Sequence, residues 1–150
     1  MKRVTSSILV ETDPKSRAKV MAKFMRISQW LRSYGNFNSL MAMIAGINNS
    51  AISRLRDTKQ NATERQGYKE FVGSELLMSS EKSFSRYRNA LKLSEPPCIP
   101  YLGVFLRDLL YIDEANKDFK PDGSVNLQKF ILMGDIILMI MNFQFRYSMA

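Results

Sequence analysis

Hydrophobic residues recur along most of the chain at the three- and four-residue spacing of an amphipathic α-helix. The clearest helix start is Asp13-Pro14, because aspartate is a favoured N-cap and proline is tolerated at the first helical position. Small and apolar residues then share one helix face at Ala18, Met21, Met25, Ser28 and Leu31. Gly35-Asn36 is a typical helix end, so the pattern predicts a helix over residues 14–34.

The middle of the chain alternates predicted helices with polar breaks. A second helix is predicted over residues 37–47, and Asn48-Asn49-Ser50 interrupts it, with Ser50 as the cap of a short turn. Residues 57–67 are polar and are interpreted as a loop or the beginning of a helix. A weaker helix over residues 64–78 is expected next, because glycines at two of its positions lower its helix propensity.

The C-terminal half is divided by the proline-rich segment 95–100, where residues that precede proline are excluded from the helical region. Before it, Ser83 is predicted to cap a helix that runs to residue 93, and after it a helix is predicted over 101–112. Residues 113–123 are expected to form a loop, and Ser124 is expected to cap a last helix over 125–145. No segment alternates with the two-residue period of a strand, so the predicted fold class is all-α.

The apolar stripes of these helices predict one hydrophobic core. Its expected members are Met21, Phe24, Leu40, Ile44, Leu55, Ile136 and Met139. The most apolar run, residues 130–141, is too short to span a bilayer and contains Asp135, so it is interpreted as a buried core helix.

The composition excludes several kinds of catalytic chemistry. A chain of 150 residues with 45% hydrophobic content is sufficient for one globular unit with its own core. It contains no histidine and one cysteine, Cys98, which excludes Ser-His-Asp and Cys-His catalysis, a Cys-rich zinc site and an internal disulfide. We therefore expect no covalent intermediate, and the lone cysteine fits a reducing, intracellular compartment.

The net charge of +8 raises the question of an anionic partner. The first 50 residues hold eight Lys or Arg and two Asp or Glu, and most of the bases follow one predicted helix. We interpret them as a solvated helix face, with nucleic acid and an anionic membrane surface as the alternatives.

Three motifs follow one another along the chain: GNFNSLMAMIAGINNSAISRL (residues 35–55), FSRYRNAL (84–91) and PPCIPYLGVFLRDLLYIDEAN (96–116). In this order they resemble the RasGEF domain, the catalytic domain of exchange factors for Ras-family GTPases. RAKVMAKFMRISQWL (17–31) and DGSVNLQKF (122–130) extend the resemblance on both sides. Because the family's domain reaches further towards the N-terminus, the resemblance implies that residues 1–150 are a partial RasGEF domain that lacks its N-terminal part.

The resemblance implies a mechanical activity without a cofactor and without covalent chemistry. A protruding antiparallel helical hairpin, here about residues 101–145, opens the nucleotide site of the GTPase. By motif position, Leu110 enters the Mg²⁺ site and Glu114 lies near the phosphates. A leucine offers the metal no ligand, a carboxylate repels phosphate, and residues four apart share one helix face. Asp113, beside Glu114, could exchange roles with it.

The resemblance also implies contacts with the GTPase. The turn at residues 48–50 matches one that touches a switch region, although Asn-Asn-Ser is also an ordinary helix break. Tyr101 and Leu102 match an apolar pair at the start of the hairpin, and Arg107 with Asp108 is expected on its outward face. The residues expected to bind the GTPase are Asn48, Asn49, Ser50, Tyr101, Leu102, Arg107, Asp108, Asp113 and Lys129.

Two departures from the family pattern favour an alternative. Where many relatives have a basic cluster, this chain has Lys129-Phe130-Ile131-Leu132, so Lys129 alone survives. Ala115 replaces the glycine of a Glu-Gly-Asn turn, and alanine does not adopt positive φ cheaply. The alternative is a catalytically inactive RasGEF-like domain that binds a GTPase or another partner without exchange.

The expected partner is a small GTPase of the Ras, Rap or Ral type, in the cytoplasm. Recruitment to the inner face of membranes would be indirect, through the lipidated GTPase. Nucleic acid is not expected, because the basic residues lie away from the motif-bearing end and no reader motif is present.

Overall fold

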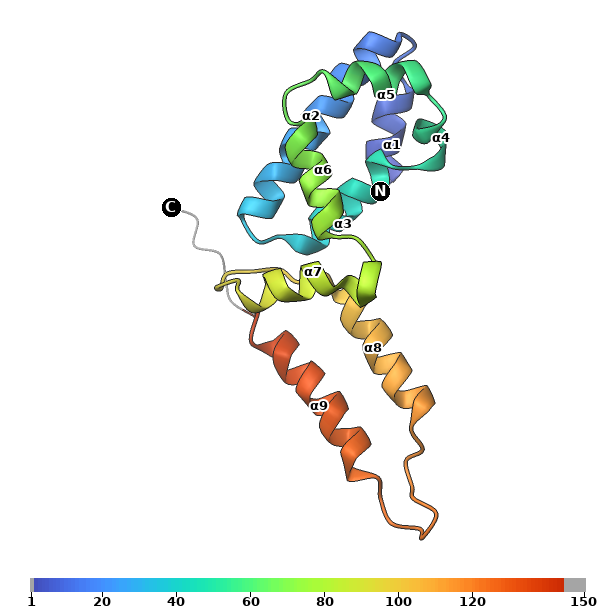
Figure 1. Ribbon diagram of the computed structural model, residues 1–150, viewed down its shortest axis with the longest axis vertical. Coiled ribbons are helices and arrows are strands. Elements are labelled where there is room, and N and C mark those ends of the chain that lie inside the picture. Colours follow the sequence, from blue (N-terminus) through green and yellow to red (C-terminus); the bar gives the residue numbers. More distant parts are fainter. Residues whose placement is uncertain (1, 145–150) are drawn as a thin grey trace.

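The computed structural model describes residues 2–144, and nine α-helices lie within this range (Figure 1). Six of them form a body: α1 (Lys2–Leu9), α2 (Pro14–Ser33), α3 (Phe37–Ile47), α4 (Ser50–Ser53), α5 (Arg56–Thr63) and α6 (Tyr68–Leu77). Below the body lies α7 (Glu81–Lys92), and α8 (Leu102–Ala115) and α9 (Leu127–Met141) project side by side from it, away from the body and with opposite chain directions. Residues 2–144 contain only two isolated β-bridges and no strand, so the all-α prediction is confirmed.

Helix α2 is the central element of the body, and it begins where the sequence predicts. The Asp13 carboxylate accepts a hydrogen bond from the Ser16 amide at 2.8 Å, and this bond lowers the pKa of Asp13. Its predicted face is largely buried, at Ala18, Met21, Met25 and Ser28, and it packs against α3, α5 and α6. The N-cap residue and the 3.6-residue hydrophobic period were therefore sufficient to predict this helix.

Two expectations for the middle of the chain are wrong. Residues 56–63 form helix α5, whose Thr58 and Ala62 are buried against α2, so of the two interpretations of the polar stretch the loop is wrong for its first part. The spacing of these two small residues was the available signal, and the polar residues around them obscured it. The cap of α4 is Asn49 rather than Ser50, because the Asn49 side chain accepts from the Ala51 amide at 3.0 Å.

The predicted serine caps of the C-terminal half are also wrong. Lys82, Ser83 and Phe84 have φ values of 47°, 55° and 61°, so the chain makes a left-handed turn there instead of an N-cap. This turn places Phe84 in the core at 8% exposure. Ser124 bonds to the Asp122 carboxylate at 2.7 Å, and Asn126 occupies the N-cap position of α9.

The hydrophobic core lies mainly in the body. Met21, Leu40 and Ile44 are buried as predicted, while Phe24 and Leu55 are partly buried. Ile136 packs partly against the core, but Met139 is 42% exposed, so its assignment to the core is wrong. The physical reason is that α9 packs against α8 and leaves most of its apolar surface open.

The proline-rich segment fastens the start of α8 to the body. The Phe37 amide donates to the Ile99 carbonyl at 2.9 Å, and the Ile99 amide donates to the Gly35 carbonyl at 3.0 Å. Tyr87 of α7 is fully buried; its ring meets Phe37 edge to face, and its hydroxyl accepts from the Tyr101 amide at 2.7 Å. The base of the hairpin therefore rests on hydrogen-bonded and aromatic contacts with α7 and the turn before α3.

Tyr87 predicts a loss of stability in alkali. Burial raises its pKa to about 12, above the ordinary value of 10.0, so the folded state favours the neutral phenol. Its contribution to stability is complete below pH 10 and is lost as the pH rises towards 12, because the unfolded chain ionises first. Urea unfolding at a series of pH values should show this decline. Tyr87→Phe should flatten it while costing about 1 kcal/mol at pH 7 through the lost acceptor, and an unchanged slope would contradict the assignment.

The helices α8 and α9, with the connecting residues 116–126, form a hairpin that leaves much surface in water. The chain exposes 10374 Å². A compact monomer of its mass, 17.3 kDa, would expose roughly 7,800 Å².

Helix α9 is apolar nearly all round, yet Ile131, Leu138 and Met141 are each more than half exposed. The interpretation of residues 130–141 as a buried core helix is therefore wrong; residue 145, the expected end of the hairpin, lies outside the described residues. In the described part of the chain no helix is long and apolar enough to cross a bilayer.

Candidate functional site

The two positions expected to act at a nucleotide site lie on the outer half of α8. This helix continues to Ala115, three residues beyond its predicted end, so Leu110 and Glu114 are one turn apart on the same helix. Leu110 is 56% exposed and Glu114 is exposed. Both side chains are thus accessible to a partner on α8, a helix that projects from α7 (Figure 1).

Leu110 belongs to an exposed apolar row on α8. Leu102, Leu106 and Leu110 follow one another at four-residue intervals, and each is more than 40% exposed. Glu114 continues the same four-residue interval and ends the row with a carboxylate. Sequence reasoning missed Leu106, although the spacing of four from Leu102 and Leu110 was a sufficient signal.

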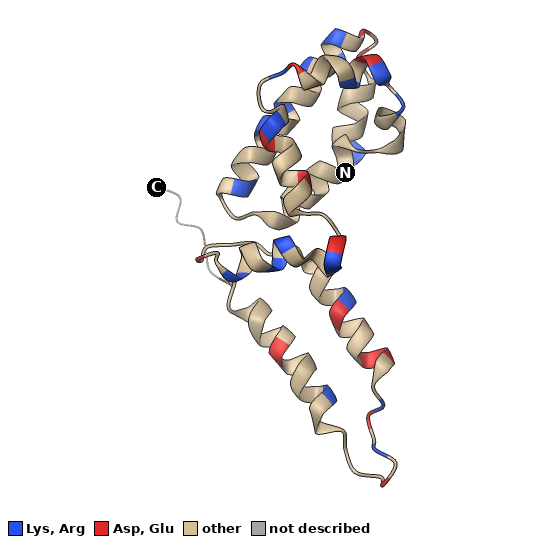
Figure 2. Ribbon diagram, in the orientation of Figure 1, with Lys and Arg blue, Asp and Glu red and all other residues tan. Residues whose placement is uncertain are grey.

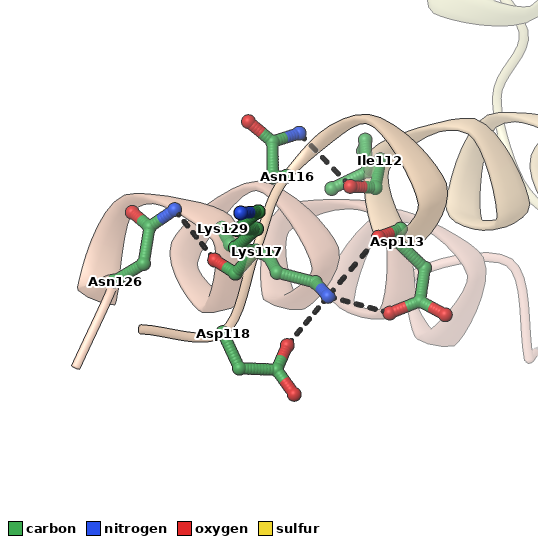
Figure 3. A network of polar contacts seen from close by, with 7 residues as sticks. All are labelled: Ile112, Asp113, Asn116, Lys117, Asp118, Asn126 and Lys129. Atoms are coloured by element: carbon green, nitrogen blue, oxygen red, sulfur yellow. Dashed lines mark hydrogen bonds and ion pairs between the residues drawn. The ribbon is translucent and has the colours of Figure 1, made fainter. Parts of the chain in front are cut away.

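Lys129, at the start of α9, does not face solvent. Its side chain is 4% exposed, and its ammonium is 2.6 Å from one carboxylate oxygen of Asp113 and 2.6 Å from one of Asp118 (Figure 3). The ammonium also donates to the Asp113 carbonyl at 3.2 Å. The hydrogen bonds to Asp113 and Asp118 raise the pKa of Lys129 above its ordinary value. Such burial gives no support to a direct contact between Lys129 and a partner.

The connecting segment is also fastened to the ends of both helices. The Asn116 side chain donates to the Ile112 carbonyl at 2.9 Å, which satisfies an acceptor in the last turn of α8. Asn126 donates from its side chain to the Lys117 carbonyl at 3.0 Å (Figure 3). Its backbone amide also donates to the Asp118 carbonyl at 2.7 Å. Asn116 is extended, and neither it nor Ala115 has positive φ, so this turn closes without a glycine.

The base of α8 is held by charge and aromatic contacts. Asp108 forms an ion pair with Arg88 of α7 at 2.6 Å, so it faces α7 rather than outward. The Arg107 guanidinium lies 5.3 Å above the Phe84 ring. Tyr101 is partly buried between Phe84 and Tyr87, which leaves Leu102 as the more exposed member of the expected apolar pair.

The turn at residues 48–50 lies on the body, apart from the hairpin residues (Figure 1). The Asn48 side chain donates to the Glu75 carboxylate, Asn49 caps α4, and Ser50 is exposed. The structure therefore brings together the expected residues of the hairpin, and it places the expected turn on a separate part of the surface.

Charge is distributed unevenly between the two parts. Lys and Arg are frequent on the body and on α7, whereas α9 carries one cation, Lys129, and one acid, Asp135 (Figure 2).

A hollow of about 580 Å³ lies between α7 and the base of the hairpin, with Leu91, Phe105 and Met139 among its lining. The exposed leucines of α8 are outside this hollow and form a ridge, whereas Glu114 lines a separate, open hollow together with Asp113 and Lys129.

Comparisons with known proteins agree with the family resemblance of the three sequence motifs at residues 35–55, 84–91 and 96–116. The model of the RasGEF domain matches residues 1–131. Ras guanine nucleotide exchange factor H of Dictyostelium discoideum is 40% identical over 143 residues, which cover 95% of this chain and 23% of that protein. Exchange factor A of the same organism is 38% identical over 147 residues, covering 94% of this chain and 24% of that protein. Exchange factor J of the same organism is 38% identical over 142 residues, which cover 93% of this chain and 17% of that protein. The chain thus spans a quarter or less of the length of these relatives.

Proposed function

Because the chain belongs to the RasGEF domain family, we propose that it promotes GDP release from a Ras-family small GTPase by inserting the α8–α9 hairpin at the nucleotide site. The observation that carries the proposal is the row of exposed leucines on α8, which ends in Glu114 in the last turn of that helix. The activity needs no cofactor and no covalent step.

The proposed mechanism follows from how proteins hold nucleotides. The phosphates of GDP are bound by backbone N–H groups, a lysine and a metal ion. Leu110 in the metal site would remove the divalent countercharge without offering a ligand. The carboxylate of Glu114 would compete for the phosphate donors, and at 5 Å with an effective dielectric constant of 20 it repels a unit negative charge by about 3 kcal/mol. Exchange is accelerated because the hairpin binds the nucleotide-free GTPase more tightly than the loaded one.

The other expected contacts divide into direct and indirect ones. Leu102, Arg107 and the turn at residues 48–50 are accessible, and we propose that they touch the GTPase. Asp113 is exposed but pairs with Lys129, and Asp108 pairs with Arg88. We propose that these paired residues, with the partly buried Tyr101, act through the shape of the hairpin.

One observation favours an inactive binding domain as the second candidate. Phe130, Ile131 and Leu132 occupy positions where many family members have bases, and all three are more than a third exposed. An apolar surface there could bind a partner without the contacts that bases make. This candidate predicts binding of a GTPase without nucleotide release.

The proposed setting is the cytoplasm. Contact with the inner face of a membrane would come through the lipid anchor of the GTPase. The identity of the GTPase as Ras, Rap or Ral type, and the activity of any longer protein that contains this chain, are part of the proposal.

The deciding experiment measures release of fluorescent GDP from Ras-, Rap- and Ral-type GTPases, with excess unlabelled nucleotide, in the presence and absence of the chain. We expect acceleration for at least one type, and chelation of Mg²⁺ provides the control that each GTPase can release its nucleotide. No acceleration for any type, together with measurable binding to a nucleotide-free GTPase, would support the inactive domain.

A further inference from the structure

We infer that Lys129 is a positioning residue of the hairpin: it ties the end of α8 to the start of α9 and thereby holds Leu110 and Glu114 in their working orientation. This inference rests on the proposed function for its effect on nucleotide release. The tie itself, a contact of Lys129 with Asp113 and Asp118, can be tested without any GTPase (Figure 3).

The three donors of the Lys129 ammonium match three acceptors. These are the Asp113 carboxylate at 2.6 Å, the Asp118 carboxylate at 2.6 Å and the Asp113 carbonyl at 3.2 Å. Lys129 is also the one buried residue of α9, all of which lies in the described part of the chain. A lysine in that position is unusual, because charged side chains are rarely buried unless they are paired. The pairing therefore accounts for the burial.

Lys129 also supplies what the end of α8 lacks. The last turn of α8 contains no basic residue, and a helix C-terminus carries partial negative charge on its unbonded carbonyls. Asp113 is in that turn, so Lys129 places a cation at the end of α8 from a different helix. The Lys129 ammonium also offsets the negative charges of Asp113 and Asp118, whose carboxylates each lie 2.6 Å from it.

Besides the contacts of Lys129, the far end of the hairpin is held by the hydrogen bonds of Asn116 and Asn126 and by few buried side chains. The buried residues of α8 are Val104 and Phe105, both in its first turn, and α9 exposes most of its apolar residues. Glu114 follows Asp113 directly, and Leu110 lies one turn before it. A change in how Asp113 is held therefore moves both proposed functional side chains, and displacements of about 1 Å at such groups can cost about a hundredfold in rate.

The test compares Lys129→Met with Lys129→Arg in the full chain. Lys120→Met is the matched control, because Lys120 is an exposed lysine of the connecting segment, residues 116–126, close in sequence to Lys129. Hydrogen exchange without GTPase should become faster over residues 113–129 in Lys129→Met and should stay unchanged in Lys120→Met. In the GDP-release assay, Lys129→Met should lower the maximal rate by about ten- to a hundredfold, with a smaller change in the GTPase concentration at half-maximal rate. Lys129→Arg should recover part of the rate, because it restores the cation.

The two measurements separate the possible failures. Unchanged hydrogen exchange in Lys129→Met would overturn the tie. Faster hydrogen exchange with an unchanged release rate would overturn the positioning role. A change only in the GTPase concentration at half-maximal rate would also overturn it, because such a change indicates a direct contact. If the parent chain releases no nucleotide, the proposed function fails and the role in exchange fails with it, while hydrogen exchange still decides whether the tie exists.

Discussion

Glu114→Lys is expected to reduce the acceleration of GDP release by about a hundredfold, and Glu114→Ala and Leu110→Ala by about tenfold each. Tenfold in rate corresponds to about 1.4 kcal/mol, which is within the range measured for interface anchors. The lysine would attract the phosphates that Glu114 should repel, and the alanine at position 110 would leave the metal site open. Because Leu110 is 56% exposed, its truncation should cost less than about 1 kcal/mol of folding stability.

The controls for these variants are an exposed leucine and an exposed acid of the body. Leu76→Ala removes a leucine that is 51% exposed on α6, and Glu64→Ala removes an exposed carboxylate. Release rates should be unchanged in both, and circular dichroism should show the same helix content for all variants. Acceleration that survives at full strength in all three hairpin variants would reject the mechanism and leave the fold untouched.

Leu40→Ala is expected to lower the free energy of unfolding by about 3–4 kcal/mol. Leu40 is fully buried in α3, and α3 packs against both α1 and α2, so the deleted methyl groups leave a cavity among three helices. Urea unfolding followed by circular dichroism measures the loss. Leu93→Ala is the matched control, since Leu93 is 85% exposed and should change stability by less than about 0.5 kcal/mol. A loss below about 1 kcal/mol for Leu40→Ala would contradict the described core.

The sequence predicted best those helices whose start and period both carry a signal. Helices α2 and α3 were found from the cap Asp13 and from apolar spacing, because a cap bond and a buried stripe are local properties. Helix α5 was missed because its charged and polar residues outnumber its two buried positions. The left-handed turn at residues 82–84 was missed because it accompanies a tertiary feature, the burial of Phe84 beside Tyr101 and Arg107.

The candidate site could be predicted in part. The motif at residues 96–116 and the four-residue spacing predicted that Leu110 and Glu114 lie on one face of a helix, and both side chains are exposed. In the sequence, Lys129 is the one basic residue at positions where many relatives have a basic cluster. The residues next to it in the sequence gave no indication that it would be buried. Its contacts with Asp113 and Asp118 join residues 16 and 11 positions away, which periodicity within a single helix does not reveal.

The open apolar surface of α9 also affects how stability depends on temperature. Heat capacity rises on unfolding because apolar groups become hydrated, by about 2 kcal/mol/K for an ordinary domain of this length. In this molecule the side chains of Ile131, Leu138 and Met141 are already largely hydrated before unfolding begins. The heat-capacity increment should therefore be smaller than for a compact chain of 150 residues, and the stability curve should be correspondingly flat, with a shallow maximum and weak curvature on either side.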